Sequence, residues 1–93
     1  MSDRTGSIHY AKYQESPRLQ RFLALMLDGH QRTTREIDRT ADIQAVNSAA
    51  CELRMNGFDV RCIKKSKPAI YQLFGVAQAR HLSARLLEEK AAA

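Results

Sequence analysis

The sequence has few of the features that mark secreted or membrane proteins. Its 93 residues include two cysteines, Cys51 and Cys62. Two are too few for the disulfide framework of a small secreted scaffold, and their spacing matches no zinc pattern. The longest apolar run, from Phe22 to Leu27, is far too short to cross a bilayer, and the first residues lack the apolar segment of a secretion signal. We therefore expect a cytoplasmic protein with no export signal, membrane contact or metal site.

Residues that could carry out catalysis are also scarce. His9, His30 and His81 fall in three separate segments, so their spacing suggests no set of nucleophile, base and orienting acid. No glycine-rich phosphate loop is present, and a chain this short forms one domain without room for a large cleft. We expect neither enzymatic activity nor a cofactor.

Acidic residues are outnumbered, with ten Asp and Glu against fifteen Lys and Arg, which gives a net charge of +5. This excess suits a polyanionic partner, with nucleic acid first and an acidic membrane or protein surface behind it. The hydrophobic share of 44% and charged share of 27% are those of an ordinary globular chain, which excludes wholesale disorder.

The first helix has a well-marked start. Residues 1–15 show no clear period and are expected to form an arm that is mobile or loosely docked. Ser16 can cap free N–H groups, and Pro17 at the first helical position gives up a donor that would be unpaired anyway. Gly29 is expected to end this helix after Asp28. Apolar residues recur between them at helical spacing, at Leu19, Phe22, Leu23 and Met26.

A second, brief helix is predicted from a capping box. The Thr33 side chain can accept the N–H of Glu36, whose carboxylate reaches back to the N–H of Thr33. The helix is expected to run to about Thr40, with Ile37 as its main apolar anchor. Asp42 is positioned to cap a third helix a few residues later.

The third helix has two different faces. Its apolar side consists of Ile43, Val46, Ala49, Ala50 and Leu53. Its opposite side, related by spacings of three, four and seven residues, consists of Gln44, Asn47, Ser48 and Cys51. We expect the first side to pack in the core and the second to face outward. Gly57 is the expected left-handed stop.

Beyond Gly57 the apolar period changes to two, which predicts strands. Residues 58–63 alternate in polarity, and residues 69–74 are rich in strand-forming side chains. Residues 64–68 connect these runs and include three lysines. The pattern predicts a hairpin with a basic tip.

A last helix is predicted after Gly75, with Ala91 to Ala93 frayed. Its apolar side consists of Val76, Ala79, Leu82 and Leu86. Two uses compete for that side. It either packs on the first helix of its own chain, or Ala79, Leu82 and Leu86 pair with a second subunit. We favour a homodimer, because one small module rarely reaches genomic specificity alone.

This element order is that of an α+β winged helix-turn-helix domain: a three-helix core and a basic hairpin wing, here followed by a C-terminal helix. We divide the chain into an arm (1–15), the winged helix-turn-helix domain (16–74) and the C-terminal helix with its tail (75–93).

The stretch from Leu19 to Phe74 also resembles small phage and prophage helix-turn-helix proteins. The resemblance lies in residues 33–37 (TTREI), 52–60 (ELRMNGFDV) and 71–73 (YQL). These fit a Glu-Leu-Arg-x-x-Gly signature that continues with Phe or Tyr, any one residue, and Ile or Val, ahead of a Tyr-x-Leu strand. The resemblance implies a winged-helix fold, DNA binding and a mobile-element origin.

The predicted DNA contacts fall into two groups. Residues expected to contact bases are Gln44, Asn47, Ser48 and Cys51, because amides match adenine and a small apolar group can touch a thymine methyl. Residues expected to contact the backbone are Arg32, Thr33, Thr34, Arg35, Arg61, Lys64, Lys65 and Lys67. The alternatives are a merely solvated helix face and lysines that only protect a strand edge. Arg54 is expected to pair with Asp59 or Glu52 on the protein.

The function favoured by these residues is sequence-specific binding of double-stranded DNA by a phage-type transcriptional regulator. One alternative is a phage-made inhibitor that docks on a host nucleic-acid-processing complex. Another is a recombination accessory factor that bends DNA.

Overall fold

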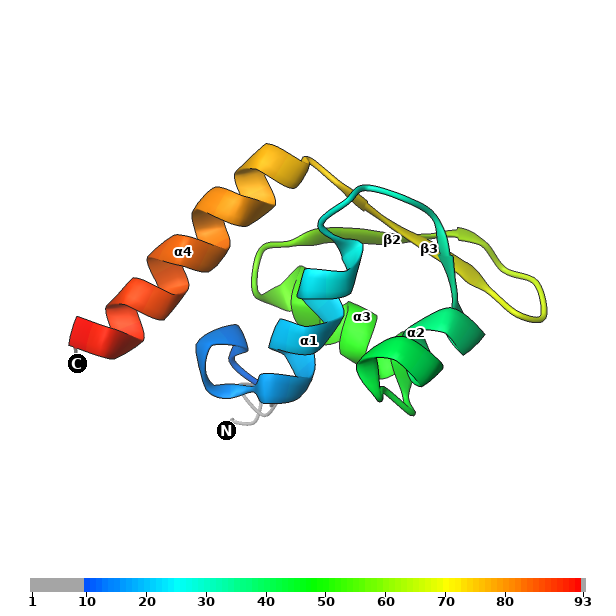
Figure 1. Ribbon diagram of the computed structural model, residues 1–93, viewed down its shortest axis with the longest axis horizontal. Helices are drawn as coiled ribbons and strands as arrows, with labels where there is room; N and C mark the ends of the chain where they lie inside the picture. The colour runs from blue at the N-terminus through cyan, green and yellow to red at the C-terminus, as the bar shows by residue number, and fades with distance from the viewer. Residues whose placement is uncertain (1–9, 93) are drawn as a thin grey trace, which may run out of the picture.

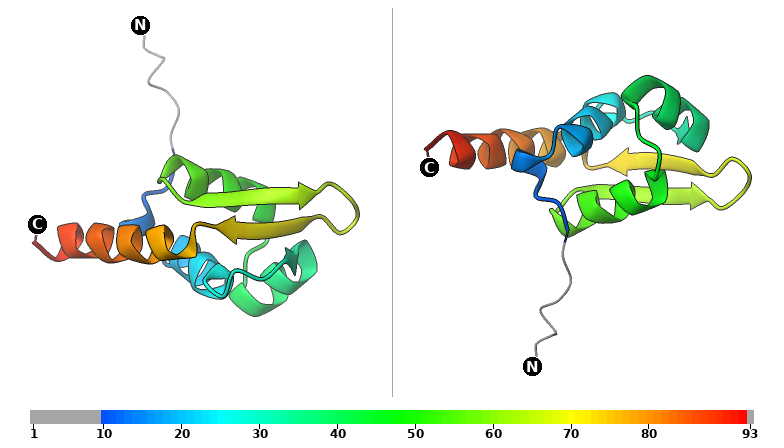
Figure 2. Two further views of the ribbon diagram at one scale, coloured as in Figure 1. Left: turned by 90° about the horizontal axis from the view of Figure 1, so that it is seen from above. Right: turned by 90° about the horizontal axis from the view of Figure 1, so that it is seen from below.

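The computed structural model describes residues 10–92, which form a small α+β domain with a three-stranded antiparallel sheet. The hairpin of the sheet projects from one end of the domain and the C-terminal helix from the other (Figures 1 and 2). Within residues 10–92, no helix is both long and apolar enough to span a membrane. The elements in chain order are η2 (Tyr13–Glu15), α1 (Pro17–Met26), β1 (Arg32–Thr33), α2 (Thr34–Ala41), α3 (Val46–Met55), β2 (Asp59–Lys64), β3 (Ile70–Phe74) and α4 (Val76–Ala92).

The predicted start of α1 is confirmed. The Ser16 hydroxyl accepts the N–H of Leu19 at 3.2 Å, and Pro17 is the first helical residue. The helix ends at Met26, two residues earlier than expected, and Gly29 takes a left-handed φ of 75° in the following turn. All four apolar residues expected to face the core are buried: Leu19, Phe22, Leu23 and Met26.

The capping box of α2 is also confirmed. The N–H of Glu36 donates to the Thr33 hydroxyl at 3.1 Å, and the N–H of Thr33 donates to the Glu36 carboxylate at 3.0 Å. Ile37 is fully buried, as expected for the anchor of this helix. Such local hydrogen bonds depend on neighbouring residues alone, which is why the sequence reveals them.

The expected cap of the third helix is wrong. Asp42 ends α2 in the left-handed conformation, at φ 57° and ψ 53°, which Asp tolerates better than most residues. The residue before α3 is Ala45, which makes no side-chain capping bond. The helix therefore begins at Val46, and Gln44 precedes it instead of forming part of its face.

The predicted hairpin is present, and it belongs to a larger sheet. Val60 of β2 pairs with Leu73 of β3, and a register shift interrupts the ladder between Cys62 and Lys64. The two-residue strand β1, which the sequence pattern does not predict, pairs with the other edge of β3. The strand order is therefore β1-β3-β2. A strand this short carries no period-two pattern that the sequence could reveal.

The core lies between the helices and one face of the sheet. The apolar side of α3 is buried as predicted, at Val46, Ala49, Ala50 and Leu53, together with Ile43 just before the helix. The hairpin contributes the inward-facing residues Val60, Tyr71 and Leu73, and Phe58 is buried just before β2. The opposite face of α3 is left exposed beside the hairpin.

Residues 10–15 belong to the folded domain and are not a loosely docked arm. Tyr13 is 4% exposed, and its ring lies 4.9 Å from that of Phe58 between centroids. Its N–H donates to the side-chain oxygen of Asn56, and the N–H of Ala11 donates to Glu52, both at 2.9 Å. This segment holds the C-terminal half of α3. The rest of the expected arm, residues 1–9, lies outside the described residues.

The apolar side of α4 packs on its own chain. Ala79 is buried, and Leu82 and Leu86 are half-buried against the core. The Tyr13 and Ser83 hydroxyls lie 2.7 Å apart and join η2 to this helix. These contacts correspond to the intramolecular alternative, except that α4 contacts mainly η2 and not α1. The pairing of Ala79, Leu82 and Leu86 with a second subunit stays a prediction.

Gly57 explains how closely α4 approaches the end of α3. Its φ of 103° fits the predicted left-handed stop. A Cβ atom at this position would also lie 2.9 Å from Cδ2 of Leu82, closer than carbon atoms pack. At the far end of α4, Ala91 and Ala92 are helical, not frayed as expected, and Ala93 is not among the described residues.

Candidate nucleic-acid interface

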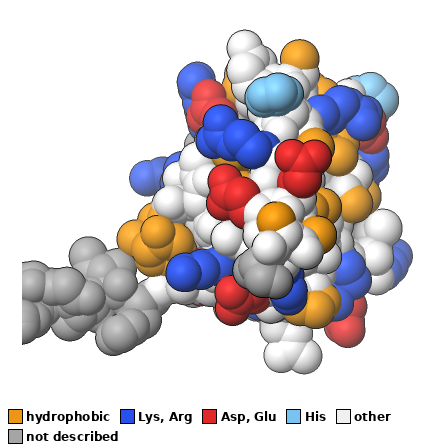
Figure 3. Space-filling model, turned by 90° about the vertical axis from the view of Figure 1, so that its left-hand side faces the viewer, with side chains coloured by type: hydrophobic (Ala, Val, Ile, Leu, Met, Phe, Trp, Pro, Cys, Tyr) orange, Lys and Arg blue, Asp and Glu red, His pale blue; other side chains and the backbone are white. Residues whose placement is uncertain are grey.

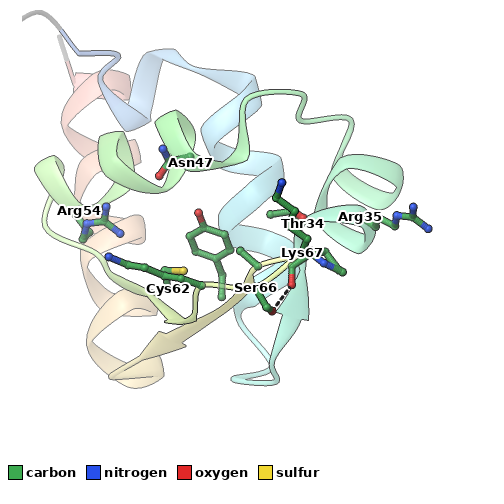
Figure 4. A pocket seen from close by; sticks show the side chains of 11 residues that line it. Thr34, Arg35, Asn47, Arg54, Cys62, Ser66 and Lys67 are labelled. Carbon is green, nitrogen blue, oxygen red and sulfur yellow. Dashed lines mark hydrogen bonds between the residues drawn. The ribbon is translucent and has the colours of Figure 1, made fainter.

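A groove of about 940 Å³ lies between the exposed face of α3 and the hairpin. We call it the α3–hairpin groove. Figure 4 shows Asn47 and Arg54 along α3 on one side, with Cys62, Ser66 and Lys67 on the other. The sequence separates these two walls by a turn and a strand, and the folded hairpin brings them together.

The α3–hairpin groove is lined by basic side chains. Arg35 comes from α2, Arg54 from α3, and Lys65 and Lys67 from the hairpin tip. Among the described residues, no Asp or Glu side chain lines it. By contrast, the end of the molecule viewed in Figure 3 shows acidic and basic side chains next to one another. The net charge of +5 indicates an excess of basic residues, and the groove is a place where basic side chains gather without acidic ones among the described residues.

A second, smaller groove of about 380 Å³ runs between α2 and α3. Gln44 and Ser48 line it, while Thr34, Arg35 and Asn47 line both grooves. Asp38 is the acidic residue of this smaller groove. Asn47 therefore stands where the two grooves meet, with an exposed amide.

The four residues expected to contact bases are all exposed, and they lie in α3 or just before it. Asn47, Ser48 and Cys51 lie on the outward face of the helix, as predicted. Gln44 lies two residues before the helix begins, so its amide belongs to the α2–α3 connection. The predicted set is brought together, although Cys51 lines neither groove.

The basic hairpin tip contributes unequally to the groove. Lys65 and Lys67 line it, whereas Lys64 ends β2 and is exposed outside the lining. The Ser66 hydroxyl donates to the carbonyl of Pro68 at 2.8 Å and so fixes the turn between the two groove lysines. The structure thus separates the three lysines that the sequence presents as one cluster.

Arg61 is not brought to the groove. The groove residues Cys62 and Tyr71 pair across the hairpin on one sheet face, and Arg61 points to the other face. Its guanidinium makes two 2.8 Å hydrogen bonds to Asp59 and lies 4.4 Å from the centroid of the Phe74 ring. The Asp59 carboxylate raises the pKa of Arg61, so the pair stays ionised. Its charge is largely compensated within the protein.

Two other expected backbone contacts are used within the fold. Arg32 pairs with Asp28 and, at 3.5 Å, with Glu36. Thr33 is occupied by the capping box. Thr34 and Arg35, the next two residues, do line the groove. Of the four consecutive residues 32–35, the first two therefore make contacts within the fold, and the last two are accessible in the groove.

Arg54 is the basic groove residue that sequence reasoning missed. The expected pairing with Asp59 or Glu52 is wrong, because Asp59 pairs with Arg61 and Glu52 with Arg18. Arg54 instead donates from Nη1 to the carbonyl of Val60 at 2.7 Å. The spacing of seven residues from Asn47 was the available signal, since it places both side chains on one helix face.

The groove floor is neutral. Tyr71 lies there beside Cys62, and burial raises the pKa of the Tyr71 hydroxyl, with Cys62 adding to the effect. The hydroxyl therefore remains protonated at neutral pH. The floor supplies no negative charge to oppose the four cations above it.

Comparison with protein-family models, with curated proteins and with solved structures found no match to this chain. Its function must be inferred from the chemistry of the α3–hairpin groove.

Proposed function

We propose that the protein is a winged helix-turn-helix protein that binds double-stranded DNA through the α3–hairpin groove. The observation that carries this proposal is the groove itself, with four basic side chains and no carboxylate among the described lining residues. An exposed helix on one side and a projecting hairpin on the other suit the ridged surface of a duplex. The strand order β1-β3-β2, with α2 and α3 between β1 and β2, supports the winged-helix interpretation.

In this proposal α3 is the recognition helix. Its ten residues span about 15 Å, and a helix fits the major groove, which is about 12 Å wide. Asn47 offers the amide that pairs with adenine, and Ser48 can donate or accept beside it. Because Ala45 makes no side-chain capping bond, the first N–H groups of α3 are available to a phosphate.

The hairpin is the wing, and its tip binds the DNA backbone. Lys65 and Lys67 face the groove from the side opposite α3, and Arg35 adds a third cation from α2. Such contacts fix the position of a protein on a duplex without reading its sequence. Lys64, Arg61, Arg32 and Thr33 are left out of this contact set because they lie outside the groove lining.

We propose transcriptional regulation by occupancy as the outcome of binding, in keeping with the resemblance to phage helix-turn-helix proteins. Fluorescence anisotropy with labelled duplexes at about 50 mM salt tests the binding itself. Saturable binding that is competed by duplex supports the proposal. No binding at low salt, together with stoichiometric capture of a host protein, would favour the inhibitor alternative.

A reporter assay separates regulation from recombination. A bound site placed at a promoter should change reporter expression with the wild-type protein and not with Asn47→Ala. Unchanged expression despite tight binding, with strong bending of the bound duplex, would instead favour the recombination accessory factor.

We also propose that the protein binds as a homodimer, through the outward side of α4. Leu87 is 41% exposed there. Basic residues, Arg80 and Arg85, precede acidic residues, Glu88 and Glu89, and all four are exposed. Two copies packed antiparallel would therefore place opposite charges against each other. Two-fold symmetry would double the surface that reads DNA.

A further inference from the structure

Arg54 and Asn47 form a pair along α3. They are seven residues apart, so two helical turns bring their side chains to the same face. Figure 4 shows both along the groove side of the helix. At 1.5 Å per residue, their positions along the helix axis differ by about 10.5 Å.

The guanidinium of Arg54 is held in place by the protein. Its Nη1 donates to the Val60 carbonyl at 2.7 Å, at the base of the hairpin. Nε and Nη2 have no acceptor among residues 10–92, although the side chain is exposed and lines the groove. Fixing one nitrogen reduces the entropy that a long side chain loses on binding. Two further nitrogens can then face a ligand.

The charge of Arg54 is also uncompensated within the described part of the chain. The two carboxylates that are nearest in sequence are used elsewhere, Glu52 by Arg18 and Asp59 by Arg61. Arg61 offers a direct contrast, because it makes a double hydrogen bond to Asp59 and stacks on an aromatic ring. Of these two arginines flanking the hairpin base, only Arg54 is poised for an external acceptor.

We propose that Arg54 reads a guanine, about three base pairs from the adenine read by Asn47. This inference rests on the proposed function of duplex binding. Arginine donates two parallel hydrogen bonds to O6 and N7 of guanine, and asparagine pairs with N6 and N7 of adenine. Since base pairs rise by about 3.4 Å, a separation of about 10.5 Å along α3 corresponds to about three steps. The target site therefore contains an A·T pair and a G·C pair at that spacing.

Substituting lysine for Arg54 distinguishes base reading from simple charge attraction. Lysine keeps the positive charge and can still donate to the Val60 carbonyl. It lacks the planar fork that makes two parallel bonds, and the two residues are not equivalent at such a site. A phosphate contact would tolerate the exchange, whereas a bidentate guanine contact would not.

The experiment is selection from a random duplex library with the intact wild-type protein, Arg54→Lys and Asn47→Ala. The wild-type motif should contain adenine and guanine about three positions apart. Arg54→Lys should reduce the preference for guanine about tenfold or more and leave the adenine preference intact. Asn47→Ala should do the reverse. Arg61→Lys, the matched exchange outside the groove, should leave the motif unchanged.

Thermal unfolding of each variant controls for structural damage through the Val60 contact. A guanine preference that survives Arg54→Lys in a folded protein would overturn the inference, as would a wild-type motif without the predicted spacing. Both results would leave the proposal of duplex binding standing. Failure of the wild-type protein to bind any duplex would overturn the proposed function itself.

Discussion

Removing the two groove lysines of the hairpin tip, in Lys65→Ala/Lys67→Ala, should weaken DNA binding and make it less sensitive to salt. Four cations line the α3–hairpin groove, and each neutralised phosphate contributes about 0.9 to the slope of log affinity against log salt. Three of these cations, Arg35, Lys65 and Lys67, are proposed to contact phosphates, which gives a slope of about −2.7 and a loss of about 40-fold between 50 and 200 mM salt. Arg35 alone gives about −0.9, or a loss of about 3.5-fold. The affinity should fall alike for all sequences, because phosphates carry no sequence information.

The matched control is Arg61→Ala/Lys64→Ala, which removes the same charge from the same hairpin. These side chains lie outside the groove lining, and Arg61 is held by Asp59. Anisotropy titrations at four or more salt concentrations should give this control a slope close to that of the wild type. Equal reductions in slope for both double variants would refute the reasoning, because binding would then depend on the net charge of the hairpin and not on the groove.

Three further predictions concern stability and assembly. Leu53→Ala, at a fully buried position, should lower the free energy of unfolding by about 2–5 kcal/mol in urea titrations; a loss below about 1 kcal/mol would contradict its core position. The N–H of Ala11, and then Arg18, lower the pKa of Glu52 below 4.5, so this carboxylate stabilises the fold above that pH and the effect is lost as the pH falls through the lowered pKa. Glu52→Gln should therefore lose less stability than the wild type between pH 7 and pH 3, and equal acid sensitivity would count against the Glu52 contacts. Sedimentation at tens of micromolar should give a dimer for the wild type and a folded monomer for Leu87→Glu; a monomeric wild type, with and without DNA, would exclude the dimer.

The parts of the fold that the sequence predicts depend on local chemistry. The Ser16 cap and the capping box at Thr33 involve atoms only three residues apart, so neighbouring residue types reveal them. The buried face of α3 follows from helical periodicity in the same way. The predicted cap at Asp42 is wrong because an Asp before an apolar run is typical of a helix N-cap, whereas here Asp42 ends the preceding helix in a left-handed conformation.

Features that depend on contacts between distant parts of the chain could not be predicted from the sequence. Tyr13 is buried because Phe58 and Ser83 come to it from 45 and 70 residues away along the chain. Arg54 enters the groove because the Val60 carbonyl orients it there. The exclusion of Arg61 from the groove could be predicted in part, because strand alternation places Arg61 and Cys62 on opposite faces of the sheet. The sequence does not reveal which of these two residues points into the groove, because that depends on how the hairpin packs on α3.

The most direct test of the central claim is to map the DNA-bound face by nuclear magnetic resonance. Backbone amide shifts of the intact protein would be followed while a duplex is added at about 50 mM salt. We predict that the largest changes fall on Thr34, Arg35, the groove side of α3 from Asn47 to Arg54 and the hairpin tip at residues 65–69. Changes concentrated on α4 or on the sheet face that carries Arg61, or no changes at all, would contradict the assignment of the α3–hairpin groove as the DNA-binding surface.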